Sequence, residues 1–305
     1  MKSREQLTSH STYAKELRGR LPAKAFAAAP TKLWLVLAHL LILAAGYFGF
    51  RSTSSISIFA ILSLIIAHSM ACIAFLAHEL SHNAIIRSRP FRYPLEVFLW
   101  ALNLIPATVW KRVHNQSHHV HTNTLKDPDR RFLKSEESLL TRWYSRLFYP
   151  QRSSMRWNPL VAFHFVPYIL RNTVAAFYPN STAPTLVPFK PSYTPTQRIN
   201  VFIELTVIFC VQVGIFHAVG SRWVTYLWAS PVAVLFTSAV VMAYIFTNHF
   251  LNPLGEFTDP LAATTSVMVP ANWAGATIWI HFQNQGARIM IAGSQDSNLD
   301  RVQDV

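Results

Sequence analysis

The sequence predicts an all-α integral membrane protein with four transmembrane helices in two hairpins, two interfacial helices and a cytoplasmic cap that carries histidines. Three observations support this fold class. Hydrophobic residues make up 51% of the 305 residues and the mean hydropathy is positive, which is unusual for a soluble domain. The apolar residues are concentrated in long runs that come in two pairs. Lys and Arg are abundant on one side of these runs and rare on the other, as the positive-inside rule describes.

The first pair of apolar runs predicts a hairpin that follows a basic cytoplasmic tail at 1–32. This tail lacks the apolar core of a signal peptide, so we expect it to stay uncleaved. The run at 33–50 is just long enough to cross a bilayer, and only the polar turn at 51–54 separates it from the next run at 56–77. A second helix that continued through His82 would be ~40 Å long and would emerge beyond the ~30 Å hydrocarbon core on the cytoplasmic side.

Two apolar segments between the hairpins are unsuited to crossing a bilayer. The segment at 94–106 is too short, and the segment at 157–177 contains Pro167 and Arg171. We therefore expect both segments as interfacial helices. The proline-rich stretch at 178–198 should be an irregular connection.

The second pair of apolar runs, at 201–219 and 226–246, predicts another hairpin with a short outer loop. Trp223 and Trp228 near this loop suit the outer interface. Four crossings return the chain to the cytoplasmic side just before His249, so all the candidate histidines would lie at one face of one membrane.

The net charge of +13 reflects this topology rather than a nucleic-acid partner. Seven Lys or Arg residues precede the first run and sixteen lie within 78–199, whereas the turns at 51–54 and 220–224 hold one each. No zinc-finger spacing or aromatic-basic strip accompanies the charge, so we expect anionic membrane lipids and no nucleic acid. Cys72 and Cys210, the only cysteines, lie in apolar runs and are interpreted as packing residues.

Two histidine clusters predict a metal site. In His78-Glu79-Leu80-Ser81-His82 two histidines are four residues apart, and the same spacing recurs between His114 and His118. On a helix this spacing places both imidazoles on one face. His119 follows about 100° further round and could serve a second metal or another side of the same centre.

These clusters resemble the first two histidine boxes of the membrane fatty acid desaturases, H-x(3,4)-H and H-x(2,3)-H-H. The resemblance extends to Asn123, to the Asp127-Pro128-Asp129 segment and to Asn248-His249, and it implies a desaturase-like membrane domain over 33–284. It further implies two iron ions that use O₂ to introduce a double bond into the acyl chain of a lipid. The implied iron ligands are His78, His82, His114, His118 and His119, followed by His249 and Asn248, with His281 ranked last.

The electrons for such a reaction must come from outside the chain. The sequence contains no His-Pro-Gly-Gly haem motif, no cysteine cluster and no Gly-x-Gly-x-x-Gly loop, so no bound haem or nucleotide is expected. The resemblance implies an external donor, either a ferredoxin or a cytochrome b5 with its reductase.

Three alternative functions stay open at this stage. Residues 78–82 read H-E-x-x-H, the motif of zinc metalloproteases in which the glutamate is the general base. A related lipid hydroxylase or ketolase would use the same boxes. No histidine follows His281, and the polar tail at 285–305 stands where the family has its third box, so a catalytically inactive desaturase fold is the other alternative.

The remaining polar residues in the apolar runs are given structural roles. We interpret His39, His68 and His217 as neutral, hydrogen-bonded packing residues, because they lack the paired spacing of the boxes. Glu204 lies near the start of the third run and is expected to reach the interface.

Overall fold

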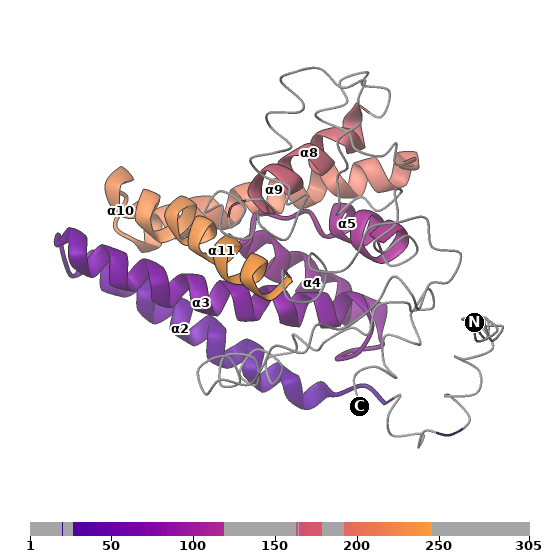
Figure 1. Cartoon of the computed structure of the whole chain (residues 1–305), viewed down its shortest axis with the longest axis horizontal. Coiled ribbons are helices and arrows are strands. Elements are labelled where there is room, and N and C mark those ends of the chain that lie inside the picture. Colours follow the sequence, from indigo (N-terminus) through magenta and orange to yellow (C-terminus); the bar gives the residue numbers. More distant parts are fainter. Residues whose placement is uncertain (1–19, 21–26, 119–162, 164, 179–191, 246–305) are drawn as a thin grey trace, which may run out of the picture.

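The structure is a computed structural model that describes residues 20, 27–118, 163, 165–178 and 192–245 (Figure 1). These residues form helices and no strand. In chain order the elements are the 3₁₀ helix η2 (Pro30–Lys32), α2 (Leu33–Arg51), α3 (Ile56–Ser81), α4 (Arg89–Leu102), α5 (Ala107–Trp110), the π-helix η3 (Lys111–His118), α8 (Phe165–Phe177), α9 (Pro195–Ala218), α10 (Trp223–Leu227), the π-helix η6 (Trp228–Val232) and α11 (Ala233–Ile245).

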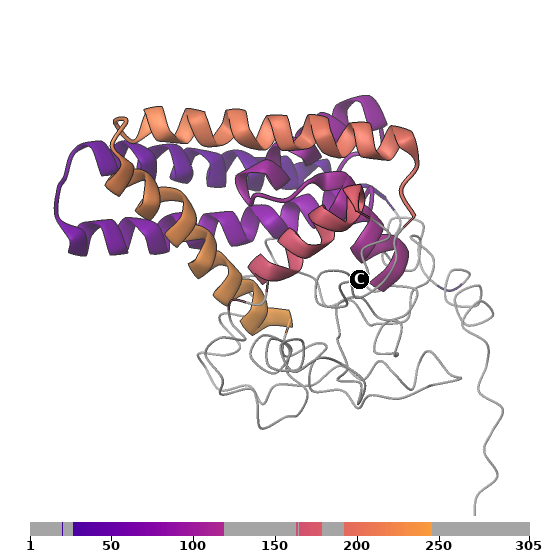
Figure 2. The same cartoon turned by 90° about the horizontal axis from the view of Figure 1, so that it is seen from above.

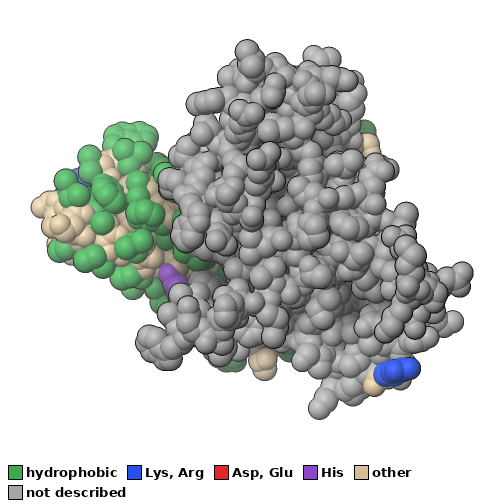
Figure 3. All heavy atoms as spheres, in the orientation of Figure 1, with side chains coloured by type: hydrophobic (Ala, Val, Ile, Leu, Met, Phe, Trp, Pro, Cys, Tyr) green, Lys and Arg blue, Asp and Glu red, His purple; other side chains and the backbone are tan. Residues whose placement is uncertain are grey.

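Four helical segments are long and apolar enough to cross a membrane, as the sequence predicts. They are Pro30–Arg51, Ile56–Ser81, Pro195–Ala218 and Trp223–Met242. Their outer faces carry exposed apolar side chains such as Trp34, which is 73% exposed. Hydrophobic side chains accordingly dominate the visible surface of these helices (Figure 3). Such a surface is compatible with lipid rather than with water.

The central helix is α3, which packs along α2 on one side and α11 on another (Figures 1 and 2). Glycine lets α2 approach α3 closely, since a Cβ at Gly46 would lie only 2.9 Å from Ile66 Cγ1. On the other side, Thr237 Oγ1 of α11 donates a hydrogen bond to the Ala67 carbonyl at 3.2 Å. These contacts bury most of α3 and fix where its last turn lies.

The two short turns between consecutive spans lie side by side at one end of the helices (Figure 2). Arg222 Nη2 donates to the Thr53 carbonyl at 3.5 Å, which connects the turn after α9 to the turn after α2. Gly220, at φ +95°, provides the left-handed backbone of the second turn. The last turn of α3, with the first histidine pair, is therefore at the opposite end of the bundle.

Two helix starts differ from the sequence prediction. Helix α9 begins at Pro195, inside the stretch expected to be irregular, because Thr194 and Gln197 form a capping box with reciprocal bonds of 3.2 and 2.9 Å. Proline is favourable at the first helical position and does not oppose this start. Helix α4 begins at Arg89, five residues before the apolar segment expected from Pro94, and keeps that proline inside the helix.

The first expected interfacial segment is interrupted, and the second is described only in part. Helix α4 ends at Leu102, and a loop separates it from the short helix α5, so the segment 94–106 is not one helix. In the loop, Leu104 adopts a positive φ of 60°. Helix α8 covers the second half of the segment 157–177, whose first residues, apart from residue 163, lie outside the described ones.

Candidate metal centre

The last turn of α3 brings the first two histidines together, as their spacing predicts. His82 caps this helix, with its N–H donating to the His78 carbonyl at 3.2 Å. The two Nε2 atoms are also 3.2 Å apart. Ser81, between them, donates its hydroxyl to the Ala77 carbonyl at 3.0 Å and stabilises the turn.

The π-helix η3 contributes the next pair. His114 Nε2 lies 3.1 Å from His78 Nε2, and one nitrogen from each of His78, His82 and His114 lies within 4.8 Å of the other two. His118 stacks on His114 with ring centroids 5.1 Å apart. The two boxes thus lie together at this end of the bundle. The second box lies on a π-helix, which is wider than the α-helix that the spacing predicts.

The environment of His114 keeps its ring neutral. Burial lowers the pKa of His114 well below 6.5, and the neighbouring His118 and His82 lower it further. On its other face, the ring stacks against Trp110 with centroids 4.5 Å apart. A neutral imidazole keeps a lone pair for a metal, so three converging imidazole nitrogens fit a borderline metal such as iron or zinc.

Glu79, the acidic residue of the H-E-x-x-H motif, forms an ion pair outside the histidine group. Its Oε2 lies 2.8 Å from Lys32 Nζ, and both side chains are largely buried. A backbone bond of 2.7 Å from Ala29 N to the Ala84 carbonyl joins the same two parts of the chain. Glu79 thus connects the start of α2 to the histidine turn.

Glu204 is buried inside the protein, where the sequence predicts a side chain that reaches the interface. The residue is 1% exposed and accepts three hydrogen bonds: 2.7 Å from the Tyr93 hydroxyl, 2.9 Å from the Thr108 N–H and 2.7 Å from the Thr108 hydroxyl. These bonds join α9 to α4 and to α5, which leads directly into η3. The sequence signal for this role was a carboxylate within an apolar run, which must find polar partners when it is buried.

A second buried carboxylate, Glu96, lies behind the first histidine pair. It accepts the Ser81 hydroxyl at 2.7 Å, which places it next to the residue that precedes His82. Burial raises the pKa of Glu96, while the bond from Ser81 and the positive charge of Lys111 act in the opposite direction. The sequence alone gives no signal for this role.

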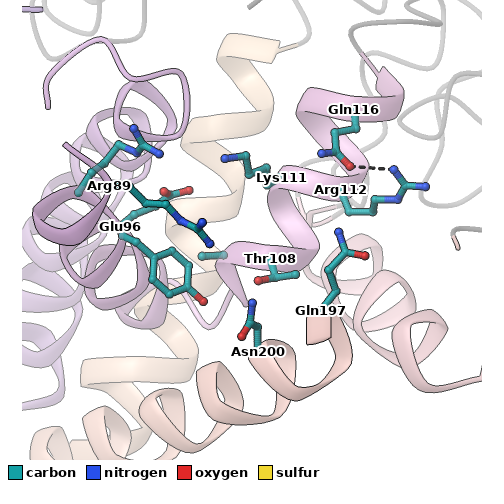
Figure 4. A pocket seen from close by; sticks show the side chains of 11 residues that line it. Arg89, Glu96, Thr108, Lys111, Arg112, Gln116, Gln197 and Asn200 are labelled. Carbon is teal, nitrogen blue, oxygen red and sulfur yellow. Dashed lines mark hydrogen bonds between the residues drawn. The ribbon is translucent and has the colours of Figure 1, made fainter. Parts of the chain in front are cut away.

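A basic pocket with a volume of about 330 Å³ opens between α4, η3 and the first turns of α9 (Figure 4). Lys111 points from η3 across the pocket toward α4, while Gln197 and Asn200 point into it from α9 (Figure 4). Besides these, its lining includes Arg89, Arg92, Glu96, Thr108 and Arg112. No motif in the sequence predicts this pocket.

The structure also brings together three residues that the sequence analysis treated separately. His39 of α2 and His68 and Cys72 of α3 place one potential ligand atom each within 4.8 Å of the others. His39 Nδ1 lies 3.4 Å from the Ser69 hydroxyl, which agrees with the expected hydrogen-bonded packing role. Cys72 is buried, as expected of a packing residue, whereas Cys210 is exposed.

Several predicted ligands lie outside the described residues. They are His119, Asn248, His249 and His281. His78, His82, His114 and His118 are therefore the predicted ligands for which the structure gives a position.

Comparison with known proteins identifies a family for most of the chain. A model of the fatty acid desaturase family matches residues 54–286. A Delta(12) fatty acid dehydrogenase of Crepis alpina is 23% identical over 182 residues, which are 58% of this chain and 48% of that protein. An endoplasmic reticulum omega-6 fatty acid desaturase of Glycine max, isozyme 2, is 24% identical over 178 residues, covering 57% of this chain and 45% of that protein. The matches thus span just under half the length of these relatives.

Proposed function

Because the chain belongs to the fatty acid desaturase family, we propose that it introduces a double bond into the acyl chain of a membrane lipid, with two iron ions and O₂. The observation that carries this proposal is the convergence of His78, His82 and His114 through their Nε2 atoms. His118 and His119 complete the set from the second box, and His249, Asn248 and His281 are further candidate ligands. Bound iron would supply O₂ activation and the removal of hydrogen from an unactivated methylene.

The residues of the chain hold this centre in place. The neutral ring of His114 is held between Trp110 and His118, so it needs no reorientation to bind a metal. Glu204 fixes the start of the second box through Thr108. Bound iron would thus supply the redox chemistry, and the protein would orient the histidine ligands around it.

The lipid substrate is proposed at the level of an acyl chain. The names of the relatives refer to the Delta(12) and omega-6 positions, so a double bond at that position is the first product to look for. We further propose that the N-terminus and the histidine end of the helices face the cytoplasm, since the basic residues are concentrated there. A ferredoxin or a cytochrome b5 with its reductase would deliver electrons to that side.

Iron content and product formation test the proposal in parallel. The full-length chain, purified in detergent, is analysed for metals, and cells that express it are analysed for new double bonds by mass spectrometry of their lipids. His78→Gln removes the central ring of the cluster, whereas His217→Gln makes the same change at an exposed histidine of α9. We expect about two irons per chain, with both iron and product lost only in His78→Gln.

Other outcomes identify the alternatives. One zinc per chain that depends on His78 and His82, but not on His118, would favour a zinc metalloprotease over a desaturase. A folded chain with neither iron nor product would indicate an inactive desaturase fold. A hydroxylated or keto product in place of a double bond would assign the chain to a related lipid hydroxylase or ketolase.

A further inference from the structure

The basic pocket shown in Figure 4 carries more positive charge than its own acidic residue balances. Four cationic side chains line it, and Glu96 is its one carboxylate: the cations are Arg89, Arg92, Lys111 and Arg112. Within the described part of the chain, neither Arg89 nor Lys111 forms an ion pair within 4 Å. Four cations beside one carboxylate leave an excess of positive charge at the cavity, which favours an anionic ligand.

Two of the arginines are held in position by hydrogen bonds within the protein, and each also has an Nε–H group that could donate to a ligand. Arg92 is 8% exposed and donates from Nη1 to the Arg87 carbonyl at 3.0 Å, while its buried Nε has no hydrogen-bond partner. Arg112 donates to Gln116 Oε1 at 2.8 Å and to Ser192 Oγ at 3.1 Å, and its Nε is likewise without a partner. Buried polar atoms without partners are costly unless a ligand satisfies them.

The start of α9 adds uncharged donors to the pocket. Gln197 and Asn200 lie in the first two turns of this helix and point into the cavity (Figure 4). The positive end of the helix dipole lies at the same place, and it favours negative charge within the first turn. Cations, amides and a helix N-terminus together match the oxygens of a phosphate group.

The position of the pocket connects it to the lipid and to the metal centre. It opens at the histidine end of α3 and α9, where a membrane-spanning helix would meet the lipid head groups. Lys111 is in the same helix as His114, three residues before it. Thr108, also in the lining, is held by Glu204. The pocket therefore shares a helix with the second histidine box.

We propose that this pocket binds the phosphate of a phospholipid head group. That the bound phospholipid is also the substrate rests on the proposed desaturase function. The pocket recognises the phosphate by charge and hydrogen bonds, so zwitterionic and anionic phospholipids both bind, whereas a diacylglycerol that carries a sugar head group does not.

Native mass spectrometry of the full-length protein in detergent tests this assignment. Dioleoyl phosphatidylglycerol, dioleoyl phosphatidylcholine and dioleoyl galactosyl glycerol are titrated against the unchanged chain and its variants. The double variant Arg89→Gln with Lys111→Gln removes the two cations that have no ion pair. Arg198→Gln is the matched control, because Arg198 is an exposed cation in the first turn of α9 but is not in the lining. Lys111→Arg keeps the charge, and thermal midpoints verify that each variant is folded.

We expect both phospholipids to bind the unchanged chain, with about fivefold weaker binding for each cation removed. Arg198→Gln and Lys111→Arg should bind as the unchanged chain does. Equal binding of the galactolipid, or equal losses in the double variant and in Arg198→Gln, would overturn the proposal. Displacement by millimolar inorganic phosphate without any preference among the lipids would also overturn it, by assigning the pocket to a soluble phosphorylated molecule.

The two proposals can fail separately. Lipid binding is measured without turnover, and desaturation is measured without the lipid titration. A chain that binds phospholipid through Lys111 but forms no double bond would keep the pocket and refute the proposed function. A chain that forms double bonds equally well with Lys111 replaced, and shows no phospholipid preference, would keep the proposed function and refute the phosphate pocket.

Discussion

Replacing Glu204 by Gln should destabilise the protein more than any conservative change on the outer faces of its spans. Three donors converge on this carboxylate: the Tyr93 hydroxyl and the hydroxyl and N–H of Thr108. A Gln side chain offers one acceptor oxygen, and its amide group would face a donor, so at least one charge-assisted bond is lost. Such bonds contribute about 1.5–3 kcal/mol, and a buried donor left unsatisfied costs about 1–3 kcal/mol. A net loss of about 2–4 kcal/mol is therefore expected.

The assay uses the reactivity of a buried thiol during heating. Cys72 is buried and Cys210 is exposed, so a thiol-reactive dye applied to a Cys210→Ser background reports the unfolding of α3. At about 2–4 °C per kcal/mol, Glu204→Gln should lower the midpoint by roughly 5–15 °C at a fixed scan rate. Thr206→Ala is the control, since Thr206 is exposed on the same helix and its hydroxyl donates to the Phe202 carbonyl of that helix. Equal shifts in the two variants would refute the view that Glu204 holds α5 in place.

Three further predictions follow from packing and from proton binding. Gly46→Ala should lower the thermal midpoint because its Cβ would lie 2.9 Å from a neighbouring side chain, whereas Gly214→Ala, with nothing within 4 Å, should raise it slightly through helix propensity. Burial raises the pKa of Glu96 above 4.5, so the contribution of this residue to stability is present below pH 4.5 and is lost as the pH rises through the folded pKa. Glu96→Gln should therefore raise the thermal midpoint more at pH 8 than at pH 4.5. A larger increase at pH 4.5 would contradict this account. Burial lowers the pKa of His114 below 6.5, so the contribution of this residue to stability is present above pH 6.5 and is lost as the pH falls through the folded pKa. The metal-free chain should therefore lose stability as the pH falls below 6.5, and an unchanged slope in His114→Gln would count against this cause.

Periodicity and length were enough to predict the four long apolar helices and the two histidine pairs. An apolar run of this length has few alternatives to a helix in a membrane, and a spacing of four places side chains on one face of most helices. The start of α9 was misplaced because the proline content of its approach outweighed the signal of the Thr194–Gln197 capping box. Local capping chemistry decided that boundary, not composition.

The polar interior of the site could not be predicted in the same way. Glu204 contacts residues about a hundred positions away in the sequence, and the pocket is lined by three separate helical segments. No periodic pattern encodes such a contact, because the residues near each partner in the sequence do not indicate a distant hydrogen bond. The sequence could indicate only that a carboxylate in an apolar run needs a partner, not that Tyr93 and Thr108 would provide it.

The π-helix η3 can also be viewed as an α-helix that has accommodated one additional residue. From this standpoint, shortening Lys111–His118 by a single residue would restore a regular α-helix and improve its local hydrogen bonding. The wide turns now carry His114 and His118 so that their rings stack with centroids 5.1 Å apart, and a changed length would alter the angle between these two side chains about the helix axis. We therefore expect this segment to tolerate substitutions better than changes of length.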